Sequence, residues 1–331
     1  MTEKGYDGVI GHEDVIAGLK EAVLSGKVAH AYIFNGEAGS GKKYIAKRFA
    51  MALLCEEKSG EPCMECKSCK MTLSGNHPDI IFVKHEKTAS VGVDEIRKQV
   101  VEDIEIRPYC SDKKIYVIPE ASKMTPQAQN ALLKTLEEPP EYAYIFLLAD
   151  NPDILLPTIL SRCVMINLRP LPDEVIEQYL MTNMAVPSYD AKLQARFALG
   201  NLGRAKRIAS AGDFDDKLRE SLRFLRNSKD MDTISRMEFD KKIAADKQGV
   251  CDYLDIFTLW FRDVLYFKAS NDLDGIIFQN EQKSIKERAA VSSYEGIMKI
   301  LEAIDAAKAR LKANVNPELV LELLFLTIWE E

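Results

Sequence analysis

The chain of 331 residues lacks a basic excess, because 44 lysine and arginine residues face 51 aspartate and glutamate residues and the formal net charge is −7. Proteins that hold duplex DNA by their own surface usually carry clustered positive charge. The charge balance therefore disfavours independent binding to duplex DNA, although it is compatible with a local basic patch.

Two kinds of apolar run are also missing. Residues 1–5 contain no apolar stretch of the secretory type, and no uninterrupted apolar run reaches membrane-spanning length. We therefore expect a cytoplasmic protein with no membrane partner. In a reducing cytosol the seven cysteines should be reduced, metal-bound or buried, and not paired in disulfides.

A phosphate-binding pattern is present, but its last position is missing. Residues 36–43, GEAGSGKK, match G-x-x-x-x-G-K-[S/T] except that Lys43 replaces the hydroxyl residue. Gly36 and Gly41 would let backbone N–H groups face a phosphate, and Lys42 would reach the outer phosphates. An ammonium group at position 43 cannot ligate magnesium. The pattern thus predicts a degenerate nucleotide site, and it leaves open whether nucleotide still binds.

A second magnesium position is missing farther along the chain. The apolar run 114–118 is followed by Pro119-Glu120. In a P-loop fold this strand ends in an acidic pair, in which one carboxylate holds magnesium and the next polarises the attacking water. Proline can do neither, and Glu120 has little to act on without the metal. Two independent losses predict that this chain does not hydrolyse ATP with Mg²⁺.

Four cysteines fall within fifteen residues and include two consecutive C-x-x-C units: Cys55, Cys63, Cys66 and Cys69. This spacing matches a tetrahedral thiolate zinc site. Free thiols or a redox pair are the alternative interpretation. We predict a zinc-binding insert over residues 55–69. Its glutamates outnumber its lysines, which disfavours DNA binding, so we expect the role of the insert to be structural.

The remaining pattern alternates apolar strands with helical stretches, which favours a parallel sheet covered on both faces, an α/β fold. The glycine loop would then lie at the carboxyl ends of the strands. A helix is expected over residues 91–104. The predicted strands are residues 31–34, 80–83, 114–118, 144–149 and 164–166.

The chain changes character after residue 168. Residues 169–172, RPLP, read as a linker, and three short helical stretches follow within residues 173–210. From about residue 212 the pattern is wholly helical, and Asn316 and Pro317 are placed to begin the last helix. The apolar stripes of these helices fit either an intramolecular core or a subunit contact.

Taken together, these features resemble the AAA+ clamp-loader family of bacterial DNA polymerase III across nearly the whole chain. The stretches that carry the resemblance are His30-Ala31-Tyr32, the four-cysteine insert, residues 130–140 (NALLKTLEEPP), residues 155–163 with their Ser-Arg-Cys ending, and residues 314–317. The resemblance implies a P-loop AAA+ core over residues 1–168 that contains the zinc insert. It also implies an all-α lid over 169–211 and an all-α collar for oligomerisation over 212–331.

The resemblance also implies one catalytic residue. Arg162 matches the arginine finger that such subunits project into the ATP site of a neighbour, and a planar, permanently charged fork suits a transferring phosphoryl group. A surface arginine paired with a carboxylate is the alternative. Asn151 and Arg204 match nucleotide-sensing positions, where a structural role is equally compatible with the sequence.

The function implied is that of a non-hydrolysing subunit that holds the geometry of the ring and supplies Arg162 in trans during sliding-clamp loading. Its partners would be the gamma/tau and delta subunits in a hetero-pentameric ring, with the sliding clamp and primer-template DNA reached through the complex. Two alternatives remain: an active gamma/tau-like ATPase with an atypical P-loop, and a zinc-dependent DNA-binding module.

Overall fold

The computed structural model describes residues 5–85, 90–227, 233–246 and 249–331. The chain divides into two compact units, a first unit of residues 1–179 with 199–204 and a second unit of residues 180–198 with 205–331. The division falls within helix α7 (Asp173–Met184). The three-domain organisation, with boundaries after residues 168 and 211, stays a prediction.

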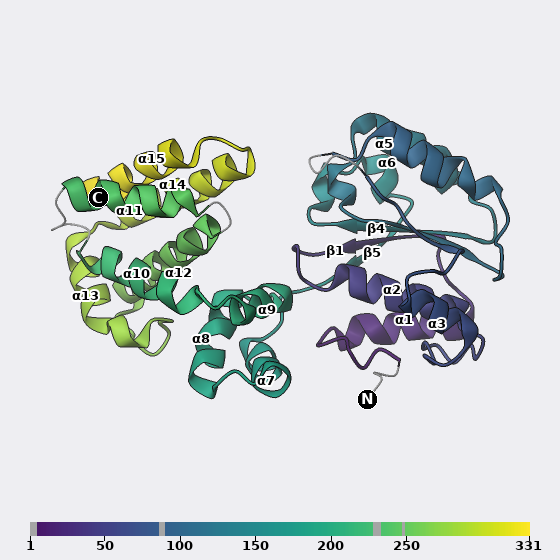
Figure 1. Cartoon of the computed structure of the whole chain (residues 1–331), viewed down its shortest axis with the longest axis horizontal. Helices are drawn as coiled ribbons and strands as arrows, with labels where there is room; N and C mark the ends of the chain where they lie inside the picture. Colours follow the sequence, from purple (N-terminus) through teal and green to yellow (C-terminus); the bar gives the residue numbers. More distant parts are fainter. Residues whose placement is uncertain (1–4, 86–89, 228–232, 247–248) are drawn as a thin grey trace. The chain divides into compact units, whose positions relative to one another are not determined.

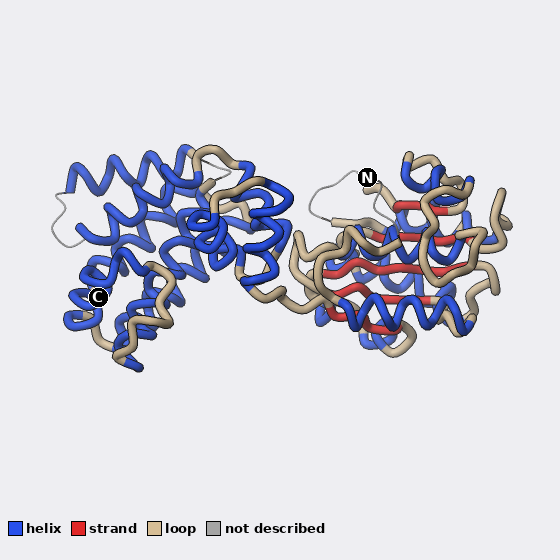
Figure 2. Tube along the Cα trace, turned by 90° about the horizontal axis from the view of Figure 1, so that it is seen from below, coloured by secondary structure: helices blue, strands red, loops and turns tan. Residues whose placement is uncertain are grey.

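The first unit is built on a five-stranded parallel sheet, as predicted (Figure 2). The strand order is β2-β3-β4-β1-β5. Every residue of β3 and β4 is buried, which is typical of a parallel sheet that has helices on both faces. The strands are β1 (Ala31–Asn35), β2 (Ile80–Phe82), β3 (Lys114–Ile118), β4 (Ala143–Ala149) and β5 (Val164–Asn167).

Helices cover both faces of this sheet (Figure 1). On one face α1 (Glu13–Ser25) and α2 (Lys42–Leu54) pack on the sheet, and α3 (Lys67–Leu73) contacts α2. On the other face lie α5 (Pro126–Glu137) and α6 (Pro157–Leu160). Alternate residues of each strand face the two cores, so Ile33 contributes to one and Phe34 to the other. The α/β expectation is confirmed.

The predicted helix over residues 91–104 is broken into three short pieces. These are α4 (Val93–Ile96), a π-helical turn (Arg97–Val101) and a 3-10 turn (Asp103–Glu105). The apolar residues Ile96, Val100 and Ile104 repeat every four residues, whereas an α-helix turns once in about 3.6 residues. The wider π turn keeps all three side chains in the same core.

The second unit is helical in its described residues, as the pattern predicts. Its helices are α8 (Ser188–Ala198), α9 (Leu202–Ser210, from residue 205 on), α10 (Phe214–Asn227), α11 (Thr233–Ala245), α12 (Val250–Ser270), α13 (Gln282–Val291), α14 (Tyr294–Lys312) and α15 (Pro317–Glu330). Helix α12 contacts α10, α13 and α14 and so lies at the centre of the core. Oδ1 of Asn316 accepts the backbone N–H of Glu318 at 2.9 Å, which confirms the predicted cap of α15.

No helix in the described part of the chain is long and apolar enough to span a bilayer.

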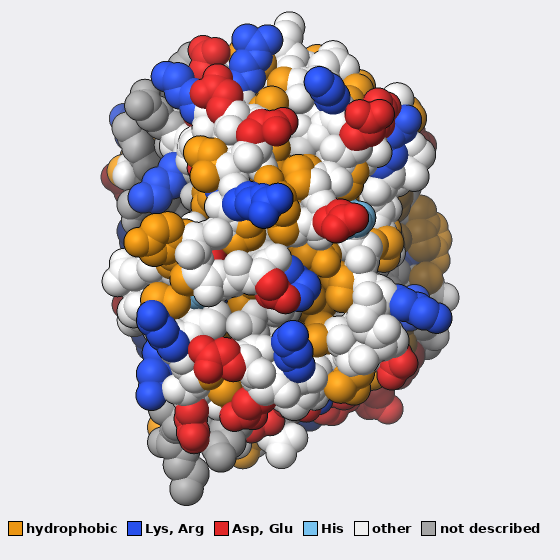
Figure 3. Space-filling model, turned by 90° about the vertical axis from the view of Figure 1, so that its right-hand side faces the viewer, with side chains coloured by type: hydrophobic (Ala, Val, Ile, Leu, Met, Phe, Trp, Pro, Cys, Tyr) orange, Lys and Arg blue, Asp and Glu red, His pale blue; other side chains and the backbone are white. Residues whose placement is uncertain are grey.

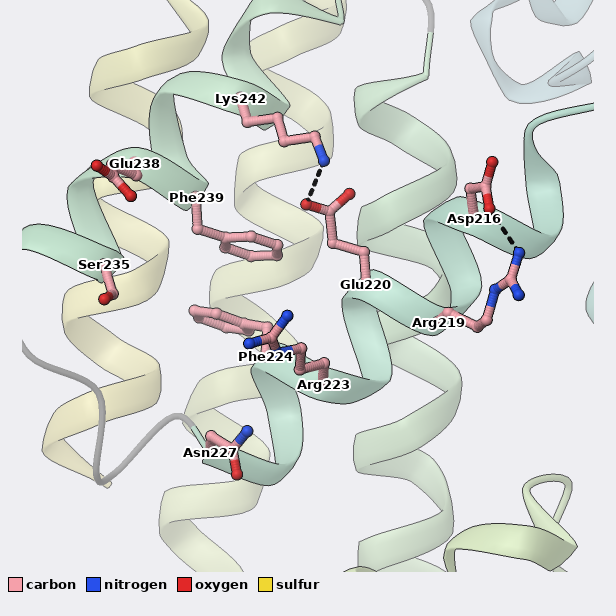
Figure 4. Close-up of a pocket in the computed structure, with 10 residues that line it drawn as sticks. All are labelled: Asp216, Arg219, Glu220, Arg223, Phe224, Asn227, Ser235, Glu238, Phe239 and Lys242. Carbon is pink, nitrogen blue, oxygen red and sulfur yellow. Dashed lines mark hydrogen bonds and ion pairs between the residues drawn. The ribbon is translucent and has the colours of Figure 1, made fainter.

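Aromatic stacking joins α10 to α11 within the second unit. The rings of Phe224 and Phe239 lie face to face, with centroids 4.2 Å apart and planes inclined by 11°. They form part of a pocket between the two helices, and its wall carries a Glu220–Lys242 ion pair at 2.7 Å (Figure 4). The pocket is thus lined by charges of both signs around an aromatic base, and its contacts serve to hold α10 on α11.

A buried lysine joins α10 to the start of α12. Lys217 is 8% exposed, and its Nζ lies 2.9 Å from Asp213, 3.2 Å from Asp246 and 3.5 Å from Asp252. Burial alone would lower the pKa of Lys217, but the surrounding carboxylates raise it above its ordinary value. The lysine therefore stays charged and neutralises carboxylates that would otherwise repel one another.

One carboxylate of the second unit lacks such a partner. Asp240 of α11 is partly buried against α15, and no hydrogen-bond donor among the described residues reaches its Oδ1. Burial, with the negative charge of Glu322 as a second cause, raises the pKa of Asp240 from 3.8 to about 6. Because the folded state disfavours the ionised form, Asp240 destabilises the fold above pH 6, and this effect disappears as the pH falls toward 4.

Asp240→Asn should therefore raise the free energy of unfolding of the second unit at pH 8 by about 1 kcal/mol, a discounted figure because the group is only partly buried. At pH 5 the gain should be smaller. Urea unfolding followed by tryptophan fluorescence reports this unit alone, because Trp260 and Trp329 are the two tryptophans of the chain. Glu302→Gln, at an exposed position of α14, is the matched control. A variant that is no more stable than the parent at pH 8 would contradict the raised pKa.

Candidate functional site

The glycine loop joins β1 to α2 at the carboxyl edge of the sheet. Gly39 and Gly41 have φ angles of 91° and 94°, in the left-handed region that favours glycine. Gly41 directly precedes α2, so the free N–H groups of the first helical turn lie next to the loop. The strand, loop and helix therefore have the arrangement of a phosphate-binding loop.

The lysine of this loop is bound within its own chain. Lys42 is 8% exposed, and its Nζ donates to the carbonyl oxygens of Gly36 at 2.5 Å and Glu37 at 2.8 Å and to Oδ1 of Asp150 at 2.6 Å. Three acceptors thus take the three hydrogens of the ammonium group. Sequence reasoning missed Asp150, although its place directly after an apolar strand was an available signal.

Residues 199–204 cover the loop from the other side. Nδ2 of Asn201 donates to the carbonyl oxygen of Ala38 at 2.8 Å, and the N–H of Gly203 donates to that of Gly39 at 3.1 Å. A Cβ on Gly203 would lie 2.7 Å from the Cα of Gly39, so the approach requires glycine. The adjoining cavity measures about 40 Å³, whereas ligand pockets usually hold about 300 Å³ or more. In this conformation residues 199–204 pack directly on the glycine loop.

Lys43 and Glu120, which flank the two lost magnesium positions in this fold, are engaged in other contacts. Nζ of Lys43 lies 5.6 Å from the ring centroid of Phe82, a cation–π distance. Pro119 follows β3, and the carboxylate of Glu120 contacts Nζ of Lys123 at 2.7 Å and Nε2 of His85 at 3.0 Å. Sequence reasoning did not assign these partners of Glu120.

Arg162 lies between α6 and β5 and is exposed. Its Nη1 donates to the carbonyl oxygen of Thr158 at 3.0 Å and to Oγ of Ser161 at 3.2 Å, and its Nη2 lies 2.9 Å from Oε1 of Glu137. The pairing with a carboxylate is the arrangement that the alternative interpretation of Arg162 expects. It does not exclude the finger, because the guanidinium remains accessible.

Strand register separates Arg162 from the glycine loop of the same chain. Tyr32 of β1 pairs with Val164 of β5, so Arg162 is level with residue 30, six residues before Gly36. At about 3.3 Å per residue the separation along the strands is about 20 Å. Arg162 therefore lies at the amino edge of the sheet and cannot reach a phosphate held at the carboxyl edge of its own sheet.

The two sensor candidates lie near the glycine loop in different ways. Asn151 follows Asp150 at the end of β4, and its Oδ1 accepts the backbone N–H of Asp153 at 3.0 Å, which begins a short 3-10 turn. Arg204 lies in the segment that covers the loop, and its backbone N–H donates to Oδ1 of Asn201 at 3.1 Å. Asn151 thus has a structural role, and the sensing role of both residues stays a prediction.

The four predicted zinc ligands are brought together, with their Sγ atoms all within 4.8 Å of one another. A tetrahedral zinc ion with Zn–S bonds of about 2.3 Å places its sulfurs about 3.8 Å apart. Backbone N–H groups donate to Cys55, Cys63 and Cys66 Sγ at 3.3 to 3.4 Å. Cys69 is fully buried at the start of α3. The donor set fits a structural zinc ion.

The insert also connects two helices of the first unit. Nη1 of Arg48, which is buried on α2, donates to Sδ of Met64 at 2.9 Å. Lys20 of α1 forms an ion pair with Glu61 at 2.5 Å. A zinc ion would therefore act as a cross-link that holds the insert against α1 and α2, and its effect is structural.

A second group of potential ligands, His77, Asp79 and Cys110, also lies within 4.8 Å. Nδ1 of His77 accepts the N–H of Asp79 at 3.1 Å, and its Nε2 lies 2.9 Å from Oγ of Ser68. Burial alone would raise the pKa of Asp79, but the N–H donors of Tyr109 and Cys110 lower it below its ordinary value. Through these hydrogen bonds His77 and Asp79 connect α3 to the loop before β3, so their role is structural.

Charge on the first unit is mixed. Basic and acidic side chains are interspersed over the face drawn in Figure 3, with apolar side chains between them. A surface that grips the DNA backbone usually has clustered lysine and arginine. The face thus agrees with the charge balance of the whole chain, which disfavours an independent DNA-binding module.

A glycine loop between β1 and α2, at the carboxyl edge of a parallel sheet with helices on both faces, defines a P-loop fold of the AAA+ class. Models of "DNA polymerase III, delta subunit" and of its C-terminal domain match residues 11–172 and 214–331. These models, together with the delta-prime relative described next, show that the chain belongs to the DNA polymerase III delta-prime family of clamp-loader subunits.

The delta-prime relative supports this assignment. The chain is 32% identical to DNA polymerase III subunit delta-prime of Bacillus subtilis (strain 168), over 94% of each chain. It is 26% identical to DNA polymerase III subunit tau of the same organism, over 96% of this chain and 60% of tau. A gamma subunit-related protein from Thermotoga maritima, of solved structure, aligns with a TM-score of 0.47 and 20% identity, over 95% of this chain and 98% of that one.

Metal analysis of the purified protein should find about one zinc ion per chain, because four thiolates complete the coordination of one ion. Cys66→Ser should release it and lower the thermal midpoint of the first unit. Cys251→Ser, at an exposed cysteine of α12, is the matched control and should keep the metal. A metal-free protein with an unchanged midpoint would show that the cluster is not a zinc site.

Proposed function

We propose that this chain is a clamp-loader subunit that does not hydrolyse ATP and that supplies Arg162 to the ATP site of a neighbouring subunit. The observation that carries the proposal is the position of Arg162 at the amino edge of the sheet, about 20 Å along the strands from its own glycine loop. An exposed arginine in that place can act on a phosphoryl group only in another chain.

The state of the glycine loop supports the absence of hydrolysis. Lys43 and Pro119 stand where metal ligands are needed, and Lys42 is bound to Asp150. Phosphoryl transfer in P-loop proteins depends on magnesium and on a lysine that reaches the phosphates. Without both, the loop serves as part of the fold, and Gly36, Gly41 and Lys42 keep at most a weak affinity for nucleotide.

The surface around Arg162 suits a neighbouring subunit. β5 is an edge strand of the sheet, and its residues Val164 and Met165 are 47% and 36% exposed. Apolar side chains on an exposed edge mark a contact surface. We propose that the AAA+ core of a gamma/tau-type subunit covers this edge and brings its ATP next to Arg162.

The second unit offers a separate contact surface. Leu319, Leu323 and Leu326 recur on one exposed face of α15 and are 57%, 54% and 46% exposed. A leucine stripe at this spacing is typical of helix-to-helix packing between chains. It supports a collar that joins this subunit to gamma/tau and delta in a pentameric ring, acting in the cytoplasm. The sliding clamp and primer-template DNA are then reached through the complex.

A working ATPase of the same family is the alternative function, and the intact Gly36, Gly41 and Lys42 favour it. The two functions differ in what the isolated chain does with ATP and in the effect of removing Arg162.

Arg162→Ala should leave folding and assembly intact but slow DNA-stimulated ATP hydrolysis by the reconstituted loader about 1,000-fold at the affected site. Arg162→Lys should rescue little, because an ammonium group lacks the planar fork. Single-turnover hydrolysis in the assembled complex is the measurement. Arg107→Ala, at another exposed arginine of the first unit, is the matched control. Unchanged hydrolysis in the Arg162→Ala complex would remove the finger.

The isolated chain should show no ATP turnover above background, and Lys42→Ala should change nothing, because the loop has no metal ligand at positions 43 and 119. Turnover is measured with phosphate release, and nucleotide binding is titrated with and without Mg²⁺. Binding that requires Mg²⁺, together with turnover that Lys42→Ala abolishes, would establish the ATPase alternative.

A further inference from the structure

Two hydrogen-bond acceptors and one carboxylate of the same chain contact the guanidinium of Arg162, and they come from two elements. Thr158 and Ser161 accept from Nη1, and both lie in or directly after α6. Glu137, the last residue of α5, contacts Nη2 through Oε1 at 2.9 Å. The side chain is therefore oriented by the end of one helix and by a carboxylate from another.

The backbone next to Glu137 and the backbone next to Arg162 are both anchored in the same apolar core of the first unit. Leu136 precedes Glu137 and is 8% exposed, and Ile159 of α6 is fully buried in the same apolar cluster. Interior packing tolerates little displacement. Glu137 and Arg162 therefore approach each other from two elements whose separation is set by the core, although both side chains are exposed.

The hydrogen-bond geometry leaves part of the guanidinium available. An arginine carries five N–H donors. Nη1 donates to Thr158 and Ser161, and Nη2 forms an ion pair with Glu137 without a hydrogen bond. In the part of the chain that the structure describes, both Nη2 hydrogens and the Nε hydrogen have no hydrogen-bond acceptor. Three donors of the planar group are thus left for an oxygen anion from outside, while two hydrogen bonds and one ion pair orient it.

The ion pair between Glu137 and Arg162 contributes too little to the stability of the fold for stability to be its main role. The side chains of Arg162 and Glu137 are 36% and 49% exposed. Ion pairs of this exposure contribute about 1 kcal/mol or less to folding. The same contact restricts the rotation of the Arg162 side chain. Less conformational entropy is then lost when the guanidinium binds an oxygen anion.

We infer that Glu137 is a positioning residue for the Arg162 finger, which presets the plane of the guanidinium for a phosphoryl group held by the neighbouring subunit. The inference rests on the proposed function of Arg162. Glu137 acts through its carboxylate, which lies 2.9 Å from Nη2 of Arg162, and it touches no reacting atom. Its role is to reduce the motion that Arg162 must lose when the transition state forms.

The test uses the loader reconstituted with its gamma/tau and delta partners and compares variants of this chain. Glu137→Ala should lower kcat for DNA-stimulated ATP hydrolysis about tenfold, because a misplaced group loses part of its transition-state contact. KM for ATP should change little, since a finger acts mainly in the transition state. Glu137→Gln keeps an acceptor oxygen of the same shape and should restore activity to within about threefold.

Glu138→Ala is the matched control, because Glu138 is the next residue and is also exposed. It should leave kcat and KM unchanged. A second comparison places Glu137→Ala in the Arg162→Ala background, where no further loss is expected because the residue to be positioned is gone.

The outcomes separate the two proposals. If Arg162→Ala abolishes hydrolysis but Glu137→Ala has full activity, the finger stands and the positioning role is wrong. A rise in KM alone, a gain in kcat, or a further loss in the Arg162→Ala background would also overturn the positioning role, because each places Glu137 outside the action of Arg162. If Arg162→Ala has no effect, the proposed function itself is wrong.

Discussion

The parallel pairing of β1 with β4 on one side and β5 on the other is the constraint on which the rest of the first unit depends. Parallel strands place everything that follows them at one edge of the sheet and everything that precedes them at the other. The glycine loop and Asp150 follow β1 and β4, so they meet at the carboxyl edge. Arg162 precedes β5 and lies at the amino edge. One geometric rule thus separates the glycine loop of the chain from the side chain that we assign to a neighbour.

At the carboxyl edge, the lysine and the backbone of the glycine loop make contacts within their own chain. Asp150 and two loop carbonyls take the hydrogens of Lys42, and Gly203 packs on Gly39. A buried ammonium group must be paired, because an uncompensated charge in the interior is strongly unfavourable. The loop therefore gains stability from these contacts, which keep the strand-to-helix connection intact without a ligand.

Most of the fold could be predicted from the sequence, because apolar runs and glycine or proline punctuation are local signals. The strands, the cysteine insert and the cap at Asn316 needed no long-range information. The helix expected over residues 91–104 was partly wrong, since a repeat of four residues is compatible with both α and π turns and only the packing of Val100 selects between them. Membership of the delta-prime family likewise followed from local motifs such as the Ser-Arg-Cys triplet.

The sequence by itself determined which groups the chain possesses: a loop without metal ligands, four thiols at zinc spacing, and an arginine in a recognisable context. Residue identity and local spacing carry that information directly. Only the tertiary structure decided which groups meet, because Asp150 lies 108 residues from Lys42 and Glu137 lies 25 residues from Arg162. Such contacts depend on strand order and register, which a single sequence does not state. The structure therefore adds the partners. The carboxylate of Asp150 binds Lys42, and the carboxylate of Glu137 contacts Arg162.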